Sequence, residues 1–158
     1  MDIRLVEPFI NSTESIIKQM TGINILAVEE PLFEEHNLSA LGITSIINFG
    51  GIIKGRFVID INSELAVKMT SNILMEDISS IKDRNCLAAI SEMSNIIAGD
   101  ANTFINNKYN LSLRLTPPIS FIGEQLTIST SKIDSFTVIF KTELGVFKIN
   151  IAFQGGME

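Results

Sequence analysis

The sequence predicts an α+β domain in which an antiparallel β-sheet carries its helices on one face. Three observations indicate this class. A helical pattern followed by strand-like runs opens the chain, and this order returns in its second half. Turns of hairpin length separate most strand-like runs, as in antiparallel sheets. The alternating strand–helix–strand units of a parallel sheet are missing. The repeated order also predicts two pseudo-symmetric halves, although they share too little sequence to demonstrate a repeat.

Length and composition indicate a single globular domain. The chain has 158 residues, of which 46% are hydrophobic and 19% are charged, which is enough to bury a sizeable core. We expect the domain to span residues 1–154. Residues 155–158, which begin with two glycines, are expected to be a frayed C-terminal tail.

The first half of the chain should contain two helices around a hairpin. The expected elements are a helix at 3–20, a strand at 23–28, a polar loop at 29–40, strands at 41–49 and 56–61, and a helix at 63–75. Gly22 is a typical C-terminal cap, and Asn62 or Ser63 is a typical N-cap. A glycine-bounded turn joins the two longer strands.

The second half should contain one long helix and four strands. The expected elements are a helix at 83–107 and strands at 111–115, 125–130, 135–142 and 146–153. The segment Thr116–Pro117–Pro118 must be extended, because proline restricts itself and the residue before it.

Composition excludes several classes of function. Cys86 and His36 are the single cysteine and histidine, too few for an internal disulfide, an ordinary zinc site or a Cys/His hydrolase. We interpret Cys86 as a core residue and Asp60 as an ordinary surface charge. The net charge of −6 without a Lys/Arg cluster disfavours nucleic acid as a partner. The chain shows no secretory signal or membrane-spanning run, so a cytoplasmic location without membrane contact is expected.

The longest predicted helix has two different sides. A helical wheel places an apolar stripe on one side, formed by Cys86, Ile90, Met93, Ile97, Ala101 and Phe104. The opposite side holds Glu92, Asn95, Gly99 and Asn102, without Lys or Arg. A glycine inside a helix costs about 1 kcal/mol relative to alanine, but it lets another backbone approach closely. An ordinary solvated face explains these residues as well, since E-x-x-N occurs often by chance.

The segment Glu92-Met93-Ser94-Asn95-Ile96-Ile97-Ala98-Gly99 resembles the E-x-x-N-x-x-x-G signature of the CheC/CheX/FliY phosphatases, and of CheX in particular. The segments 55–59 and 116–118, the latter leading to Gly123, are similar to this family too. The first helix has Ile10 and Ile17 where a second motif would need Asn. The resemblance therefore implies one active face, as in CheX.

The resemblance implies a phosphatase that dephosphorylates the aspartyl phosphate of a CheY-like response regulator. Asn95 would orient the attacking water. Glu92 would pair with the active-site lysine of the regulator's receiver domain, and Gly99 would let that domain dock closely. The receiver would supply Mg²⁺, so the chain needs no cofactor or metal site of its own. A homodimer formed through the sheets is also implied. From the wheel, Asn102 and Asn106 could shape the docking face.

Two alternatives stay open. The first is a non-catalytic adaptor of the same fold that binds a receiver domain or a flagellar-switch component. Retention of both Glu92 and Asn95 favours the phosphatase, because an adaptor needs neither. The second is a small-molecule sensor, which would need an apolar pocket with converging polar groups.

Overall fold

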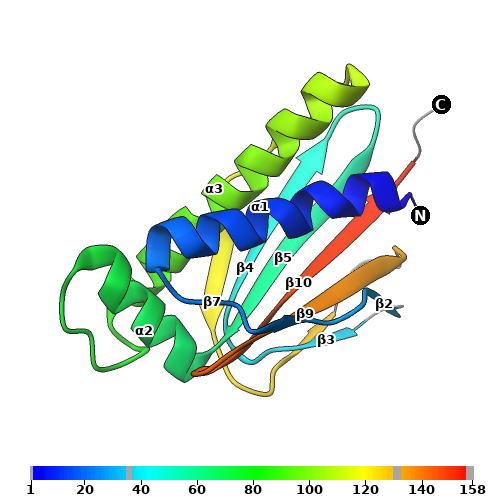
Figure 1. Ribbon diagram of the computed structural model, residues 1–158. Helices are drawn as coiled ribbons and strands as arrows, with labels where there is room; N and C mark the ends of the chain where they lie inside the picture. The colour runs from blue at the N-terminus through cyan, green and yellow to red at the C-terminus, as the bar shows by residue number, and fades with distance from the viewer. Residues whose placement is uncertain (1, 35–36, 130–132, 156–158) are drawn as a thin grey trace.

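Three helices lie on one face of a large antiparallel sheet in the computed structural model, which describes residues 2–34, 37–129 and 133–155 (Figure 1). The helices are α1 (Ile3–Thr21), α2 (Ser63–Leu74) and α3 (Arg84–Tyr109). The sheet has the strand order β1-β9-β10-β5-β4-β6, with β2 also paired to β9 and β7 also paired to β4. All these pairings are antiparallel. The predicted fold class is therefore confirmed.

The strands differ widely in length. The sheet consists of β1 (Ala27–Val28), β2 (Leu32–Glu34), β4 (Gly42–Gly50), β5 (Lys54–Asn62), β6 (Arg114–Leu115), β7 (Ile119–Ile122), β9 (Ser135–Thr142) and β10 (Gly145–Gln154). A separate two-stranded sheet pairs β3 (Asn37–Ser39) with β8 (Thr127–Ser129). The long strands β4, β5, β9 and β10 lie in the middle, so the apolar core forms between them and the helices.

The two central hairpins reflect the predicted halves. The β4–β5 hairpin lies beside the β9–β10 hairpin, and β5 pairs with β10 from Lys54↔Gln154 to Ile61↔Phe147. A long helix precedes each hairpin in sequence, and these helices, α1 and α3, lie side by side (Figure 1). Phe9 of α1 stacks on Phe57 of β5 with ring centroids 5.3 Å apart. Alternate residues of β5, starting from Phe57, therefore face the helices.

Capping side chains set the helix boundaries close to the predicted ones. Asp2 accepts a hydrogen bond from Arg4 N, Asn62 Oδ1 from Glu64 N, and Asp83 from Asn85 N. Gly22 has a φ of 69° and its N–H donates to Lys18 O, which closes the last turn of α1. These caps satisfy backbone groups that a helix end leaves unpaired.

Short strands account for the differences from prediction. Only β1 forms within 23–28 and only β6 within 111–115, whereas the predicted loop at 29–40 contributes β2 and β3. The strand β7 was not predicted. β2 and β7 are held by pairing with β9 and β4, which are distant in sequence, so local pattern carries little signal for them. His36 and most of the predicted tail, residues 156–158, lie outside the described residues; Gly155 follows the end of β10.

The sheet face opposite the helices is also largely buried, and the interpretation of Asp60 as a surface charge is wrong. Asp60 is only 2% exposed. Its two carboxylate oxygens each lie 3.0 Å from Leu41 N, one also accepts from Thr44 Oγ1 at 3.2 Å, and Lys148 Nζ lies 3.8 Å away. Burial raises the pKa of Asp60, and the hydrogen bond from Leu41 and the Lys148 charge oppose this rise only in part.

Asp60 should therefore give the protein a distinctive pH dependence of stability. Because its pKa is higher in the folded state, the folded chain holds this proton to higher pH than the unfolded chain does. The contribution of Asp60 to the free energy of unfolding should fall as pH rises above about 4. We expect Asp60→Asn to remove this component, which urea unfolding at a series of pH values measures. Asp77→Asn, at an exposed position, is the control; parallel curves for wild type and Asp60→Asn would contradict the prediction.

Candidate functional site

Helix α3 is held in place along both of its flanks. On one flank, Ser12 Oγ of α1 donates a hydrogen bond to Asp100 Oδ2 at 2.7 Å. On the other flank, Ser91 Oγ donates to Ser120 Oγ of β7 at 2.6 Å. The helix therefore sits between α1 and the β7 edge of the sheet with one long side left open.

Four serines fix the rotation of α3 about its own axis. Ser94 Oγ lies 2.7 Å from Ser45 Oγ of β4, and Ser120 Oγ donates to Ser45 Oγ at 2.9 Å. Together with Ser91 they form a chain of hydroxyl contacts, in which Ser45 and Ser94 are completely buried. Sequence reasoning missed this network. Its signal was the placement of Ser91 and Ser94 immediately before the two motif residues.

Glu92 and Asn95 lie on the open side of α3, and both are exposed. Within the described ranges, no hydrogen bond or ion pair engages either side chain. The Asn95 amide therefore has a donor and an acceptor available, and the Glu92 carboxylate is available to a cation. The predicted pair shares one exposed stripe, one helical turn apart, as the wheel indicated.

The other amides on this side of α3 are already engaged. Asn102 Nδ2 donates to Leu113 O at 2.9 Å. Asn106 Nδ2 donates to the same oxygen at 3.0 Å, and Leu113 N donates to Asn106 Oδ1 at 2.9 Å. Both residues are half-buried and hold the chain that leads into β6 against the helix. Asn95 therefore keeps an amide that no described residue engages, whereas the donor group of Asn102 has a structural partner.

Gly99 leaves an opening on the same stripe. A Cβ atom placed on Gly99 would meet nothing within 4 Å. Among the described residues, therefore, no contact requires a glycine here. One turn beyond Asn95, therefore, no side chain covers the backbone of α3, and another molecule could approach it closely.

Two large apolar side chains of α3 are exposed, and one of them was predicted to lie in the core. Phe104 was predicted to be in the core, but it is 51% exposed. It lines a pocket of about 260 Å³ beside Pro8 and Ser12 of α1, and Lys108 Nζ lies 5.5 Å from its ring centroid. Although it lies beside α1, that helix leaves about half of its side chain exposed. Ile96, 36% exposed, lies one turn after Glu92 and presents an apolar surface that sequence reasoning did not identify.

Other residues add no obvious chemistry. Cys86 is buried, as predicted, and burial raises the pKa of its thiol, which disfavours the reactive thiolate. A search of the described part of the chain finds no group of three or more His, Cys, Asp or Glu side chains that could hold a metal ion. Within the same residues, no helix combines the length and apolar character needed to cross a bilayer.

The openness of Gly99 predicts a gain in stability upon substitution. Gly99→Ala should raise the free energy of unfolding by about 0.5–1 kcal/mol, because alanine loses less backbone entropy in a helix and nothing nearby obstructs its methyl group. Gly42→Ala is the matched control with the opposite sign. A Cβ on Gly42 would lie 2.6 Å from Ser63 N and 2.7 Å from Ile61 O. Urea unfolding of both variants tests this contrast; a destabilised Gly99→Ala would show an internal requirement for glycine.

Known proteins of the same fold match nearly the whole of this chain. A CheC-like superfamily protein from Shewanella sp. PV-4 superposes with a TM-score of 0.88 at 23% identity, covering 98% of this chain and 100% of that one. The CheX of a CheX–CheY–BeF₃–Mg²⁺ complex from Borrelia burgdorferi superposes with a TM-score of 0.84 at 25% identity, covering 97% and 99% of the two chains.

Sequence comparison points to the same group. The chain is 29% identical over 147 residues to the CheY-P phosphatase CheX of Thermotoga maritima, which covers 93% of this chain and 90% of that protein. The family model described as chemotaxis phosphatase CheX matches residues 43–141, more than half of the chain and including the whole of the E-x-x-N segment. This chain therefore belongs to the CheX family of chemotaxis phosphatases.

Proposed function

We propose that this protein removes the phosphoryl group from the aspartyl phosphate of a CheY-like response regulator, with Glu92 and Asn95 of α3 as its catalytic residues. One observation carries the proposal. Glu92 and Asn95 have no partner among the described residues, although the amides of Asn102 and Asn106 nearby on the helix are engaged. The relatives agree: one is named a CheY-P phosphatase, and another forms a complex with CheY.

The reaction is hydrolysis of an acyl phosphate. The oxygen of a water molecule attacks phosphorus, the bond between phosphorus and the aspartyl oxygen breaks, and the products are a free carboxylate and inorganic phosphate. The Asn95 amide suits the task of orienting this water, because its Oδ1 accepts a hydrogen from water while its Nδ2 donates to a neighbouring oxygen. Positioning of this kind supplies much of the catalysis in phosphoryl transfer.

The rest of the exposed stripe would hold the receiver in register. Glu92 would form an ion pair with the active-site lysine of the receiver, and Ile96 would add an apolar contact beside it. Gly99 would let the receiver approach the helix backbone closely. Asn102 is a proposed docking residue whose Oδ1 is engaged by no described residue and could accept a hydrogen bond from the partner. Mg²⁺ would come with the receiver, and this chain would use no cofactor of its own.

The serine network supports this role through rigidity. A misplacement of a catalytic group by about 1 Å can lower a rate by about 100-fold. Ser91 and Ser94 directly precede Glu92 and Asn95. Ser91 anchors α3 to β7, and Ser94 anchors it to β4. The helix can therefore present Asn95 at a fixed angle to a docked partner.

Asn95→Ala should abolish acceleration of phosphate loss while the fold is retained. We expect a fall of about 100-fold in the rate with a phosphorylated CheY-like receiver from the same organism, because the water loses its orienting group. Release of inorganic phosphate gives the rate, and circular dichroism verifies the fold. Asn107→Ala, an exposed amide further along the same helix, is the matched control and should keep full activity.

Glu92→Gln tests whether the Glu92 carboxylate contributes to binding of the receiver. Loss of the charge should weaken receiver binding and reduce its dependence on salt, because the expected ion pair is exposed and screened. Titration of the receiver at two ionic strengths measures both effects. Binding of the wild type without faster phosphate loss would instead favour the adaptor alternative. An unchanged affinity of Glu92→Gln would exclude the proposed contact with lysine.

We also propose that the protein forms a homodimer and acts in the cytoplasm with its receiver. Apolar side chains are exposed along the β1–β2 edge of the sheet, among them Leu26, Leu32 and Phe33, which are 61%, 51% and 53% exposed. Pairing of sheets from two copies would cover such an edge. Sedimentation equilibrium should give twice the 17.4 kDa mass of one chain; a monomer at all concentrations would contradict the dimer and leave the phosphatase proposal standing.

A further inference from the structure

A pocket of about 380 Å³ lies on the face of the sheet opposite the helices. The side chains that matter for its chemistry are Asn48, Lys54, Arg56 and Gln154. It is separated from the exposed stripe of α3 by the thickness of the sheet. Nothing in the proposed phosphatase chemistry uses it.

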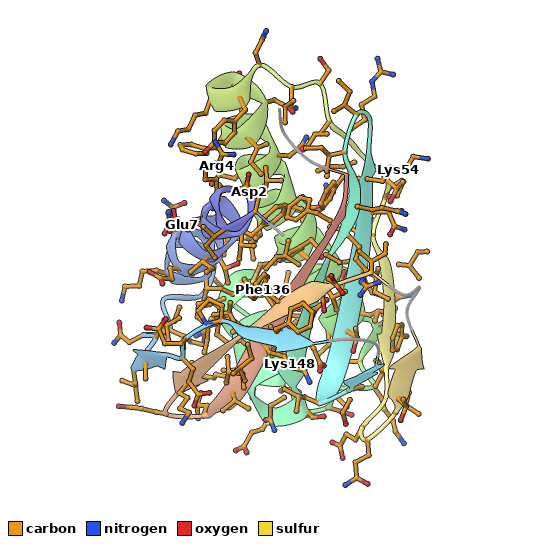
Figure 2. The ribbon with its side chains drawn as sticks, turned by 90° about the vertical axis from the view of Figure 1, so that its right-hand side faces the viewer. Asp2, Arg4, Glu7, Lys54, Phe136 and Lys148 are labelled. Carbon is orange, nitrogen blue, oxygen red and sulfur yellow. The ribbon has the colours of Figure 1, made fainter. Side chains whose placement is uncertain are left out.

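Strand register explains why these side chains converge. Asn48 of β4 is paired with Arg56 of β5, and Lys54 is paired with Gln154 of β10. Paired residues of neighbouring strands point to the same face. Phe57 stacks on Phe9 of α1, so its neighbour Arg56 points away from the helices. Figure 2 shows Lys54 at the end of the β4–β5 hairpin, on the side of the sheet away from α1.

Arg56 is a buried charge without a partner among the described residues. The residue is 7% exposed, and its Nε is completely buried, with no hydrogen-bond acceptor among the described residues. Within residues 2–34, 37–129 and 133–155, no hydrogen bond or ion pair reaches its guanidinium group. Burial lowers the pKa of Arg56, yet a guanidinium stays protonated in proteins. Buried charges are normally paired, so this one calls for a counter-charge.

The neighbouring polar groups do not supply one. Asp60, on the same face of β5, is held by Leu41 N, Thr44 and Lys148. Asn150 Oδ1 is also buried without a donor among the described residues, but an amide oxygen is neutral and cannot balance the charge of Arg56. None of the described residues that line the pocket is acidic. Although the chain has a net charge of −6, no described residue matches the positive charge of this pocket.

We propose that this pocket binds the oxyanion group, phosphate or carboxylate, of a small molecule, with Arg56 as the principal contact and Lys54 at the rim. The planar guanidinium fork matches two oxygens of either group. Lys54 is exposed and adds a second positive charge, and the amides of Asn48 and Gln154 supply neutral donors. The volume lies within the range of small-ligand sites. This site would act independently of Glu92 and Asn95.

The test follows the Arg56 side chain directly. The full ¹⁵N-labelled chain is titrated with inorganic phosphate and, separately, with malonate, while the Arg56 Nε–Hε resonance and the backbone amides are recorded. We expect a saturable shift with a dissociation constant of about 1 mM, confined to the pocket. Arg56→Gln should abolish binding and Lys54→Gln should weaken it several-fold. Lys68→Gln, at an exposed position on α2, is the control and should bind as the wild type does.

Each outcome decides the proposal. Tighter binding of phosphate assigns a phosphoryl ligand, and tighter binding of malonate assigns a carboxylate ligand. If Arg56→Gln fails to fold, Arg56→Lys serves instead; it keeps the charge without the fork and should bind about tenfold more weakly or worse. The absence of a saturable Arg56 shift with both anions, or wild-type affinity in both Lys54→Gln and the folded Arg56 variant, would overturn the proposal.

Discussion

The antiparallel pairing of β5 with β10 is the constraint on which the rest of the structure depends. Eight residue pairs, from Lys54↔Gln154 to Ile61↔Phe147, join the hairpins of the two halves. This junction creates an apolar surface wide enough for α1 and α3 to lie next to each other. Phe57 on β5 and Phe147 on β10 are fully buried in the resulting core. Without the pairing, neither hairpin could bury its inner face, because an isolated hairpin is marginal in water.

Helix α3 shows how one element can serve stability and function on different sides. Its inner side, with Ile90, Met93 and Ile97, is completely buried. Its serine-lined flank determines the angle at which the outer side faces solvent. Among the described residues, the outer side then carries three groups without a partner: the carboxylate of Glu92, the amide of Asn95 and the open position of Gly99. Residues that bring no internal benefit in a well-packed helix are the ones that point to a binding partner.

The two faces of the sheet bury different kinds of side chain. The face under the helices is aromatic and aliphatic, whereas the opposite face buries Asp60 and Arg56. Asp60 is satisfied by backbone and side-chain donors, which offset part of the cost of burying its charge. Arg56 lacks a comparable set of partners among the described residues. This asymmetry distinguishes a structural charge from one that is available to a ligand.

The sequence by itself determined the fold class, the long elements and the motif helix. Periodicity placed α1, α2 and α3 within two residues of their observed ends, because caps such as Asn62 and Gly22 are local signals. It also placed Glu92, Asn95 and Gly99 on one exposed stripe, because helix geometry depends on spacing alone. Only the tertiary structure decided which polar groups are free. Asn95 and Asn102 look equivalent on a wheel, but Leu113 engages Asn102. Likewise, β2 and β7, the exposure of Phe104 and the burial of Asp60 and Arg56 depend on contacts between distant segments, which local pattern does not encode.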